Sequence, residues 1–424
     1  MKDYIVHKSI YNLKTDKNYL EIINFCIIGL FILTLPYHIH NSVIGGFSIT
    51  IFILGLLTYK RDLKKLFTIK HIQFLFLFFT IVLLSYFYSE ENNFSLTIQS
   101  FKYFPLIIIG IYLSALTKKQ IEVLFLLFAI SPIAYVMIYY LNFFHITILY
   151  SSHYGSNGSE ILMMDLIANI IIVLSAIYFF IHSIKNMNNK HYYKTIVYFI
   201  LFIIFALSIF IDPNTHSRSM DIALLISIVI VLFYMLKWRT IVLYFIISTI
   251  LITMLSRTSH GKHISKEFFK AYNNIEKAIY HKQYNSSSGY RVGMIKLGSE
   301  LIVKNPILGI GNNSFNHVEH VRKGNIEFKT LIPHLFSFHN EHIFFLVSYG
   351  ILGYFTIVLF GIYYYKYKIQ NSYLFIFKNV IIISYVWVMT IGDYLSNKTN
   401  GNMFALLLAL LTLYAILEKE NDEN

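Results

Sequence analysis

Long apolar segments recur along almost the whole chain and are separated by short polar turns. Each segment holds about 17 to 25 mostly apolar residues, enough for a helix to cross roughly 30 Å of hydrocarbon. Because backbone groups inside lipid must be satisfied within the segment, helices are favoured. The pattern predicts an all-α polytopic integral membrane protein with about twelve transmembrane helices. We expect them to begin near Leu20, Ser42, His71, Ile98, Ile121, Glu160, Lys194, Ser219, Thr240, Glu341, Tyr373 and Asn402.

Residues 256–338 contain no spanning segment, and we expect them to form one large, partly helical loop subdomain between the ninth and tenth helices. The first part of this loop has apolar residues at helical spacing with lysines between them, which indicates a helix lying on the membrane surface. A turn at 285–289 precedes a second amphipathic stretch, 290–303, which should end before Asn305-Pro306. No linker divides the chain, so residues 1–424 are predicted to be a single membrane domain.

The lysines and arginines gather in alternate turns. They lie at 2–17, 60–65, 118–119, 185–194, 237–239 and 366–368, whereas the intervening turns at 38–41, 90–93, 150–159, 212–217 and 397–402 are poor in cations. Short cytoplasmic loops collect such residues. We therefore expect both termini to be cytoplasmic and the 256–338 loop to face the other side of the membrane.

Composition narrows the classes of protein further. Hydrophobic residues make up 56% of the chain and charged residues 13%, and the mean hydropathy is +0.58, which excludes an ordinary soluble globular domain. Membrane orientation accounts for much of the net charge of +13, so nucleic acid is not a predicted partner. The single cysteine, Cys26, excludes an internal disulfide, and the first span resembles a retained helix more than a cleaved signal.

Two arginines are candidates for anion binding. Arg218 is expected at the outer end of a helix, where it suits either a side chain reaching headgroup phosphates or an anion clamp. Arg291, on the second loop helix, is ambiguous alone. Together they could donate several charge-assisted hydrogen bonds to a diphosphate, whose negative charge grows as its bond to a sugar breaks.

His339 and Asn340 stand where the long loop re-enters an apolar helix. An imidazole is partly neutral near pH 7 and could accept a proton from a sugar hydroxyl, although a polar helix cap is an alternative. Asn340 is expected to cap the helix. Gly350 and Gly353 are expected to let this helix pack closely against a neighbour.

The remaining polar candidates carry weaker signals. Gly309 and Gly311 lie in a turn whose backbone amides could approach an anion. Asp165 and Asn169 lie one turn apart in one apolar span and suit either a functional role or a buried hydrogen bond. The loop is rich in histidines, but no full ligand set with a recognised spacing is present, so no metal is predicted.

With these residues assembled, the chain resembles the O-antigen ligase family of Gram-negative bacteria, which is related in its core to O-antigen polymerases. The resemblance rests on Ser217-Arg218, on Arg291 followed by residues 304–311, and on His339-Asn340-x9-Gly350-x-x-Gly353. It implies about twelve transmembrane helices with one large periplasmic loop. It also implies transfer of a glycan from undecaprenyl diphosphate to the lipid A-core oligosaccharide in lipopolysaccharide biosynthesis, at the periplasmic face of the bacterial inner membrane and without a metal or nucleotide cofactor.

By the same resemblance, Arg218 and Arg291 would bind the diphosphate and His339 would activate the acceptor hydroxyl, with inversion at the anomeric carbon. The segment before Arg218 reads Thr215-His216-Ser217, where many relatives have threonine or serine directly before the arginine. Only the Ser217-Arg218 pair matches closely, and the role of His216 stays open.

Two alternatives remain at this point. An O-antigen polymerase would use the same donor but a second lipid-linked glycan as acceptor, and the His-Asn-x9-Gly motif with its single dominant loop favours a ligase instead. A transporter of polyprenyl-linked glycan would also suit about twelve helices. The chain shows no evident paired halves, and its candidate residues gather at one membrane face rather than at the midplane, which argues against transport.

Overall fold

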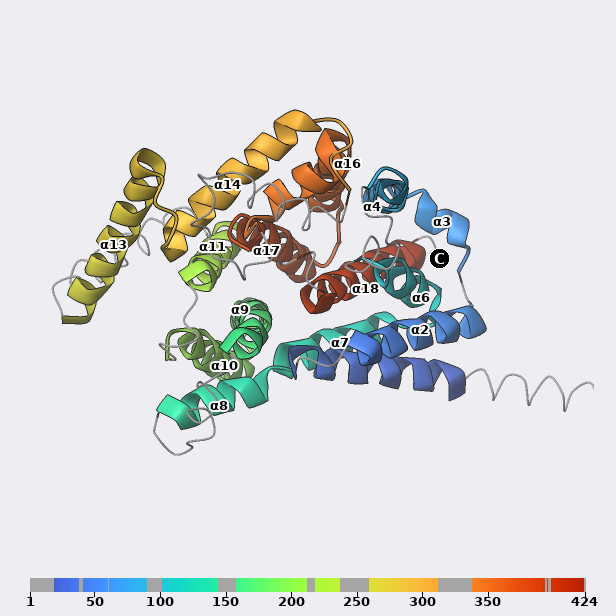
Figure 1. Cartoon of the computed structure of the whole chain (residues 1–424). Helices are drawn as coiled ribbons and strands as arrows, with labels where there is room; N and C mark the ends of the chain where they lie inside the picture. The colour runs from blue at the N-terminus through green and yellow to red at the C-terminus, as the bar shows by residue number, and fades with distance from the viewer. Residues whose placement is uncertain are drawn as a thin grey trace, which may run out of the picture.

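The computed structural model describes residues 19–37, 41–59, 61–89, 101–143, 158–211, 218–236, 259–311, 338–392, 395 and 398–422 (Figure 1). All regular structure in these ranges is helical, which confirms the predicted all-α class. Besides the first span, the longer helices are α2 (Asn41–Thr58), α4 (Lys70–Leu84), α6 (Phe104–Leu113), α7 (Lys118–Ile130), α8 (Ile133–Phe143), α9 (Gly158–Asn188), α10 (Tyr192–Ile211), α11 (Arg218–Met235), α13 (Ser259–His281), α14 (Ser287–Lys304), α16 (Glu341–Lys366), α17 (Ser372–Met389) and α18 (Lys398–Asp422).

Eight segments of the described chain are long and apolar enough to cross a membrane. They are Tyr19–Tyr37, Lys70–Phe87, Lys118–Met137, Asn169–Asn188, Tyr192–Ile209, Glu341–Lys366, Ser372–Met389 and Asn400–Asp422. Three shorter apolar helices, Ser42–Thr58, Phe104–Leu113 and Met220–Met235, coincide with further predicted spans. The helix expected near Thr240 lies outside the described residues, so the number of about twelve stays a prediction.

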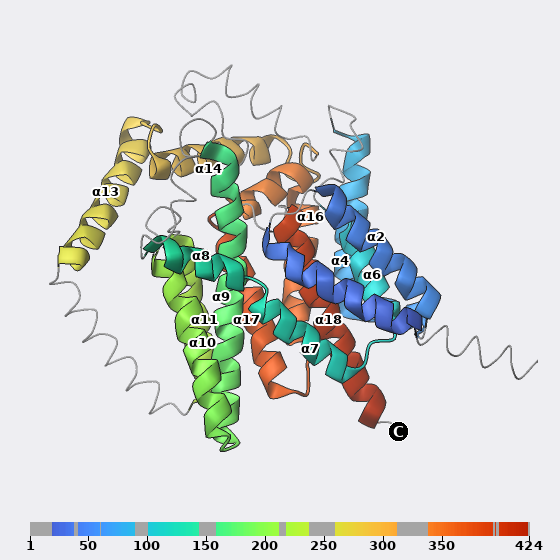
Figure 2. The same ribbon diagram turned by 90° about the horizontal axis from the view of Figure 1, so that it is seen from below.

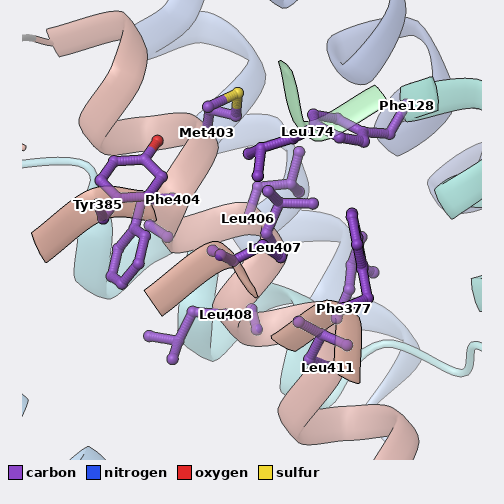
Figure 3. Packing of buried hydrophobic residues seen from close by; sticks show 14 of the residues in the cluster. Phe128, Leu174, Phe377, Tyr385, Met403, Phe404, Leu406, Leu407, Leu408 and Leu411 are labelled. Carbon is purple, nitrogen blue, oxygen red and sulfur yellow. The ribbon is translucent and has the colours of Figure 1, made fainter. Parts of the chain in front are cut away.

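Helix α18 occupies the centre of the bundle. Its stretch from Met403 to Ala415 is apolar on nearly every side and almost wholly buried, as expected of a helix with neighbours all round. It packs against α6 and α7. Figure 3 shows its side chains among residues of α7, α9 and α17: the labelled neighbours are Phe128, Leu174, Phe377 and Tyr385.

One end of the bundle carries the described cation-rich turns at 185–194 and 366–368. The Glu418 carboxylate near the end of α18 accepts hydrogen bonds from the backbone amides of Gln370 at 2.7 Å and Asn371 at 2.9 Å, between α16 and α17. Lys185 of α9 lies over the ring of Tyr373 at the start of α17. The turn between α9 and α10 and the end of α18 lie on this side in Figure 2. Which compartment this end faces stays a prediction.

The opposite end carries both helices expected in the long loop. Helix α14 lies across the ends of the bundle helices, with α13 beside it (Figure 2). Ser286 caps α14 by accepting a hydrogen bond from the Gly289 amide at 3.1 Å, and α14 ends at Lys304, directly before Asn305-Pro306. These local boundaries agree with the sequence prediction, whereas residues 312–337 of the loop lie outside the described chain.

A buried lysine closes the far end of α16. Lys378 of α17 donates from Nζ to the carbonyl oxygens of Tyr364 at 2.9 Å and Tyr365 at 2.8 Å, and also to that of Tyr367. The last carbonyls of a helix have no partner within the helix. The buried ammonium group of Lys378 therefore supplies the hydrogen-bond donors that these carbonyls need.

Replacement of Lys378 by methionine should destabilise the protein by about 3 kcal/mol, because buried carbonyls lose their donor. Thermal unfolding in detergent, followed by near-UV circular dichroism, measures the change. Lys368→Met, at an exposed position of the same turn, is the matched control and should leave the melting temperature unchanged. Equal melting of both variants would show that Lys378 does not stabilise this end of α16.

Candidate functional site

His339 sits in the short turn that leads into α16, at the end of the bundle occupied by α14. Its backbone is left-handed, with φ of 47°, a conformation that non-glycine residues adopt only where their surroundings enforce it. Its ring meets the ring of Tyr290 edge to face, with the centroids 5.7 Å apart. Tyr290 is itself buried in the small apolar cluster between α14 and α16. The imidazole is therefore held in place by a helix distant in sequence.

Arg291 follows Tyr290 on α14 and acts electrostatically on the same imidazole. Burial lowers the pKa of His339 from its ordinary value of 6.5, and the positive charge of Arg291 lowers this pKa further. Arg291 is exposed at this end. The structure thus brings two predicted site residues together from separate segments, and at pH 7 it favours a neutral imidazole that can accept a proton.

Asn340 caps α16, as expected from the sequence. Its Oδ1 accepts from the Ile343 amide at 3.1 Å, and its Nδ2 donates to the Thr390 carbonyl at 3.1 Å, at the end of α17. The next residue, Glu341, was not predicted to matter, yet its carboxylate is fully buried and accepts a hydrogen bond from the Leu395 amide at 2.7 Å. Two consecutive side chains therefore fasten the start of α16 to the segment that follows α17.

Gly350 breaks α16, whereas a continuous helix packing on a neighbour was predicted. Its φ of 61° and ψ of −167° are not helical. His342 and Tyr354, twelve residues apart, lie on opposite sides of the break, and the Tyr354 hydroxyl is 3.3 Å from His342 Nδ1. Twelve residues of straight helix would rise about 18 Å, so α16 turns sharply at Gly350.

Gly353 lies one turn beyond the break, in helical backbone, and provides room there. A Cβ at this position would overlap the Cβ of Tyr349 and would approach Ile81 of α4 at 3.5 Å. The tight contact of Gly353 is thus with Tyr349 across the break in its own helix, and its contact with α4 is an ordinary one.

Residues 305–311, which we call the docking loop, run into the break in α16. The amides of Ile310 and Gly311 donate to the carbonyls of Val347 at 2.8 Å and Ser348 at 2.9 Å. In the other direction, the amides of Ile351 and Leu352 donate to the carbonyls of Pro306 at 2.9 Å and Ile307 at 3.3 Å. The docking loop therefore replaces the helical hydrogen bonds that the break removes. These loop amides are used inside the protein, which corrects the prediction that they approach an anion.

Glycines on both partners permit this contact. Gly309 and Gly311 have φ of 71° and 87°. A Cβ on Gly350 would overlap the backbone of Ile307, and one on Gly309 would come within 2.6 Å of the Gly350 nitrogen. Tyr88, just beyond α4, donates from its hydroxyl to the Leu308 carbonyl at 2.9 Å. The docking loop thus ties α14 to both α16 and α4.

The remaining predicted residues are described less fully. Arg218 begins α11, but its side chain lies outside the described part of the structure, as do His216 and the side chain of Asp165. Asn169 is buried in α9. Among the described residues, no group of three or more histidine, cysteine, aspartate or glutamate side chains is placed to hold a metal ion.

The long apolar helices, together with a polar histidine and arginine site at one end of the bundle, define a polytopic membrane protein. Residues 200–358 match the family model described as O-antigen ligase. The matched segment includes α11, α14, the docking loop and the break in α16, and so contains Arg218, Arg291 and His339, whereas Asp165 and Asn169 precede it. No curated protein matches the chain in sequence. The resemblance drawn from the motifs is confirmed at the level of the family.

Gly350→Ala should destabilise the protein by more than about 2 kcal/mol, because alanine is strained at positive φ and its methyl group would overlap the docking loop. Gly361→Ala is the matched control in the same helix, since no neighbouring group lies within 4 Å of the place that its methyl carbon would take. It should be neutral or stabilise the protein by up to about 1 kcal/mol. Thermal unfolding in detergent measures both; a tolerated Gly350→Ala would mean that the break is not required.

Proposed function

We propose that the protein is a glycosyltransferase that moves an O-antigen glycan from undecaprenyl diphosphate to the lipid A-core oligosaccharide. The main observation behind this proposal is that Arg291 acts on His339, whose pKa is lowered by burial and by that arginine. A cation that can hold a diphosphate stands beside a base that can accept a proton from a hydroxyl. The match of residues 200–358 to the O-antigen ligase family model supports this reaction class.

In the proposed reaction, the oxygen of an acceptor sugar attacks the anomeric carbon of the glycan while the bond from that carbon to the diphosphate breaks. The acceptor proton passes to His339. Arg291 and Arg218 hold the negative charge that develops on the leaving undecaprenyl diphosphate. Attack from the side opposite the leaving group inverts the anomeric centre. The donor bond supplies the driving force, so the reaction needs no nucleotide or metal ion.

The site is proposed to face the periplasm, with both termini in the cytoplasm of the bacterial cell and the bundle in the inner membrane. Helix α14 lies at the end opposite the turn between α9 and α10 and the end of α18 (Figure 2), and His339 contacts Tyr290 of α14. Short loops rich in lysine and arginine mark the cytoplasmic side. The lipid-linked donor and the lipid A-core acceptor would then both reach the site from the membrane surface.

Transfer by purified protein in liposomes tests the function, with undecaprenyl-diphosphate glycan as donor, lipid A-core as acceptor, and neither nucleotide nor metal added. We expect glycan-bearing lipid A-core, and a loss of at least about 100-fold in rate for His339→Ala, the size of a general-base contribution. His281→Ala, at an exposed position of α13, is the control and should retain the activity. Longer lipid-linked glycan without a lipid A product would instead indicate a polymerase.

The arginines give a separate test in the same assay. Arg291→Lys should reduce kcat/KM by about tenfold or more, because a point charge lacks the bidentate fork of a guanidinium, and Arg218→Ala should abolish transfer. Lys296→Arg, further along the exposed side of α14, is the control for exchanging one basic side chain for the other at constant charge and should leave the rate unchanged. Unchanged transfer in either arginine variant removes that residue from the mechanism.

The dependence of the rate on pH tests the role of His339. Because burial and Arg291 lower the pKa of His339 from its ordinary value, the decline of kcat/KM on acidification should have its midpoint below the pH at which an ordinary histidine titrates. In Arg291→Gln the pKa of His339 should rise, so the decline should move to higher pH. In His339→Gln the residual rate should lose this dependence; a decline that persists there belongs to another group.

A further inference from the structure

Helix α13 has an apolar face that no other described segment covers. Phe269, Tyr272, Ile279 and Tyr280 are 70%, 65%, 57% and 75% exposed, and they recur at helical spacing along one stripe, which also carries the exposed Glu276. Among the described side chains of α13, Ala278 is the buried one, and it lies on a different side of the helix. Large aromatic and aliphatic side chains on one stripe are costly to leave in water.

The flank of this stripe is basic. Lys270 and Lys277 are both exposed and lie two turns apart on the same side of α13, and the sequence of the helix contains four lysines against two glutamates. Apolar residues on one side with lysines along the flank are typical of helices that lie in the surface of a membrane rich in anionic lipid.

The connections of α13 hold it at one end of the bundle. Its last residue, His281, is joined to α14 by the short segment 282–286, and α14 packs on α16. Its first residue, Ser259, follows the apolar segment predicted to span the membrane from near Thr240, which lies outside the described residues. Because five residues of extended chain reach at most about 18 Å, α13 stays near α14 at this end of the bundle.

We propose that α13 is an interfacial anchor whose apolar stripe lies among the lipid acyl chains and whose lysines contact anionic headgroup phosphates. The lipid bilayer surface is thus its partner. The anchor fixes the depth of α14, which carries Tyr290 and Arg291. The anchor would thereby hold Arg291 at the depth where a lipid-borne diphosphate arrives. This positioning of Arg291 rests on the proposed function, whereas the anchor itself is independent of that function.

Spin-label accessibility on the full chain in nanodiscs tests the anchor. Cys26 is the only cysteine, so Cys26→Ser gives a background for a nitroxide at Ile279→Cys or, as its matched control, at Lys277→Cys. In discs containing anionic lipid, the ratio of collisions with oxygen to collisions with a water-soluble nickel chelate should be about fivefold or more higher at 279 than at 277, because oxygen concentrates in lipid. Replacing both Lys270 and Lys277 with glutamine should lower the ratio at 279.

Two outcomes would overturn the anchor. Equal, water-like ratios at 279 and 277 would mean that the stripe is not in lipid. Shielding of position 279 from both reagents, with spin-spin broadening between labelled copies, would mean that a second copy of the chain covers it. Neither the collision ratio nor the spin-spin broadening needs a substrate. A negative result for the anchor can therefore be distinguished from a negative result in the transfer assay.

Discussion

The break in α16 at Gly350 and the docking loop that fills it form the constraint on which the site depends. A helix that stops inside an apolar bundle leaves carbonyls and amides that cost several kcal/mol each if they stay without partners. The backbone of residues 306–311 supplies those partners in both directions, through four hydrogen bonds. Since these bonds join backbone to backbone, they fix the docking loop, and with it the end of α14, in one position.

The start of α16 is also held in place by hydrogen bonds to a distant segment. Asn340 reaches Thr390, and Glu341 binds the Leu395 amide, so the segment that follows α17 holds the first turn of α16. Tyr290 then packs against His339 from the other side. A histidine with a left-handed backbone is stable only if such contacts outweigh its strain. The imidazole is positioned by parts of the chain on both sides of it in sequence, and small shifts of α14 or α17 would move it.

The helices and several of their boundaries could be predicted from local sequence. The break in α16 and the burial of Glu341 could not, because they depend on backbone groups distant in sequence. The apolar segments gave the helices, and Asn340, the 285–289 turn and Asn305-Pro306 gave helix boundaries, because each acts on its own neighbours. Gly350 was misjudged, since Gly-x-x-Gly in an apolar segment looks the same in a packed helix and in a broken one. What breaks the helix here is a loop some forty residues earlier, bound through backbone groups that leave no side-chain signature. The burial of Glu341 was missed for the same reason, because Leu395 decides it. The pairing of Arg291 with His339 was expected only as far as a shared membrane face.

The proposed reaction needs two groups that disfavour each other when both are charged. Arg291 lowers the pKa of His339, so before the donor binds, the imidazole is neutral and able to accept a proton but is only a weak base. A diphosphate held by Arg291 would offset that positive charge and raise the basicity of His339 when the acceptor arrives. As the reaction proceeds, the imidazolium that forms would stand beside a leaving group that is gaining negative charge, and attraction would replace the initial repulsion. Such a sequence depends on holding the arginine close to the histidine before any substrate is present, which is what the docking loop and the ties around α16 achieve.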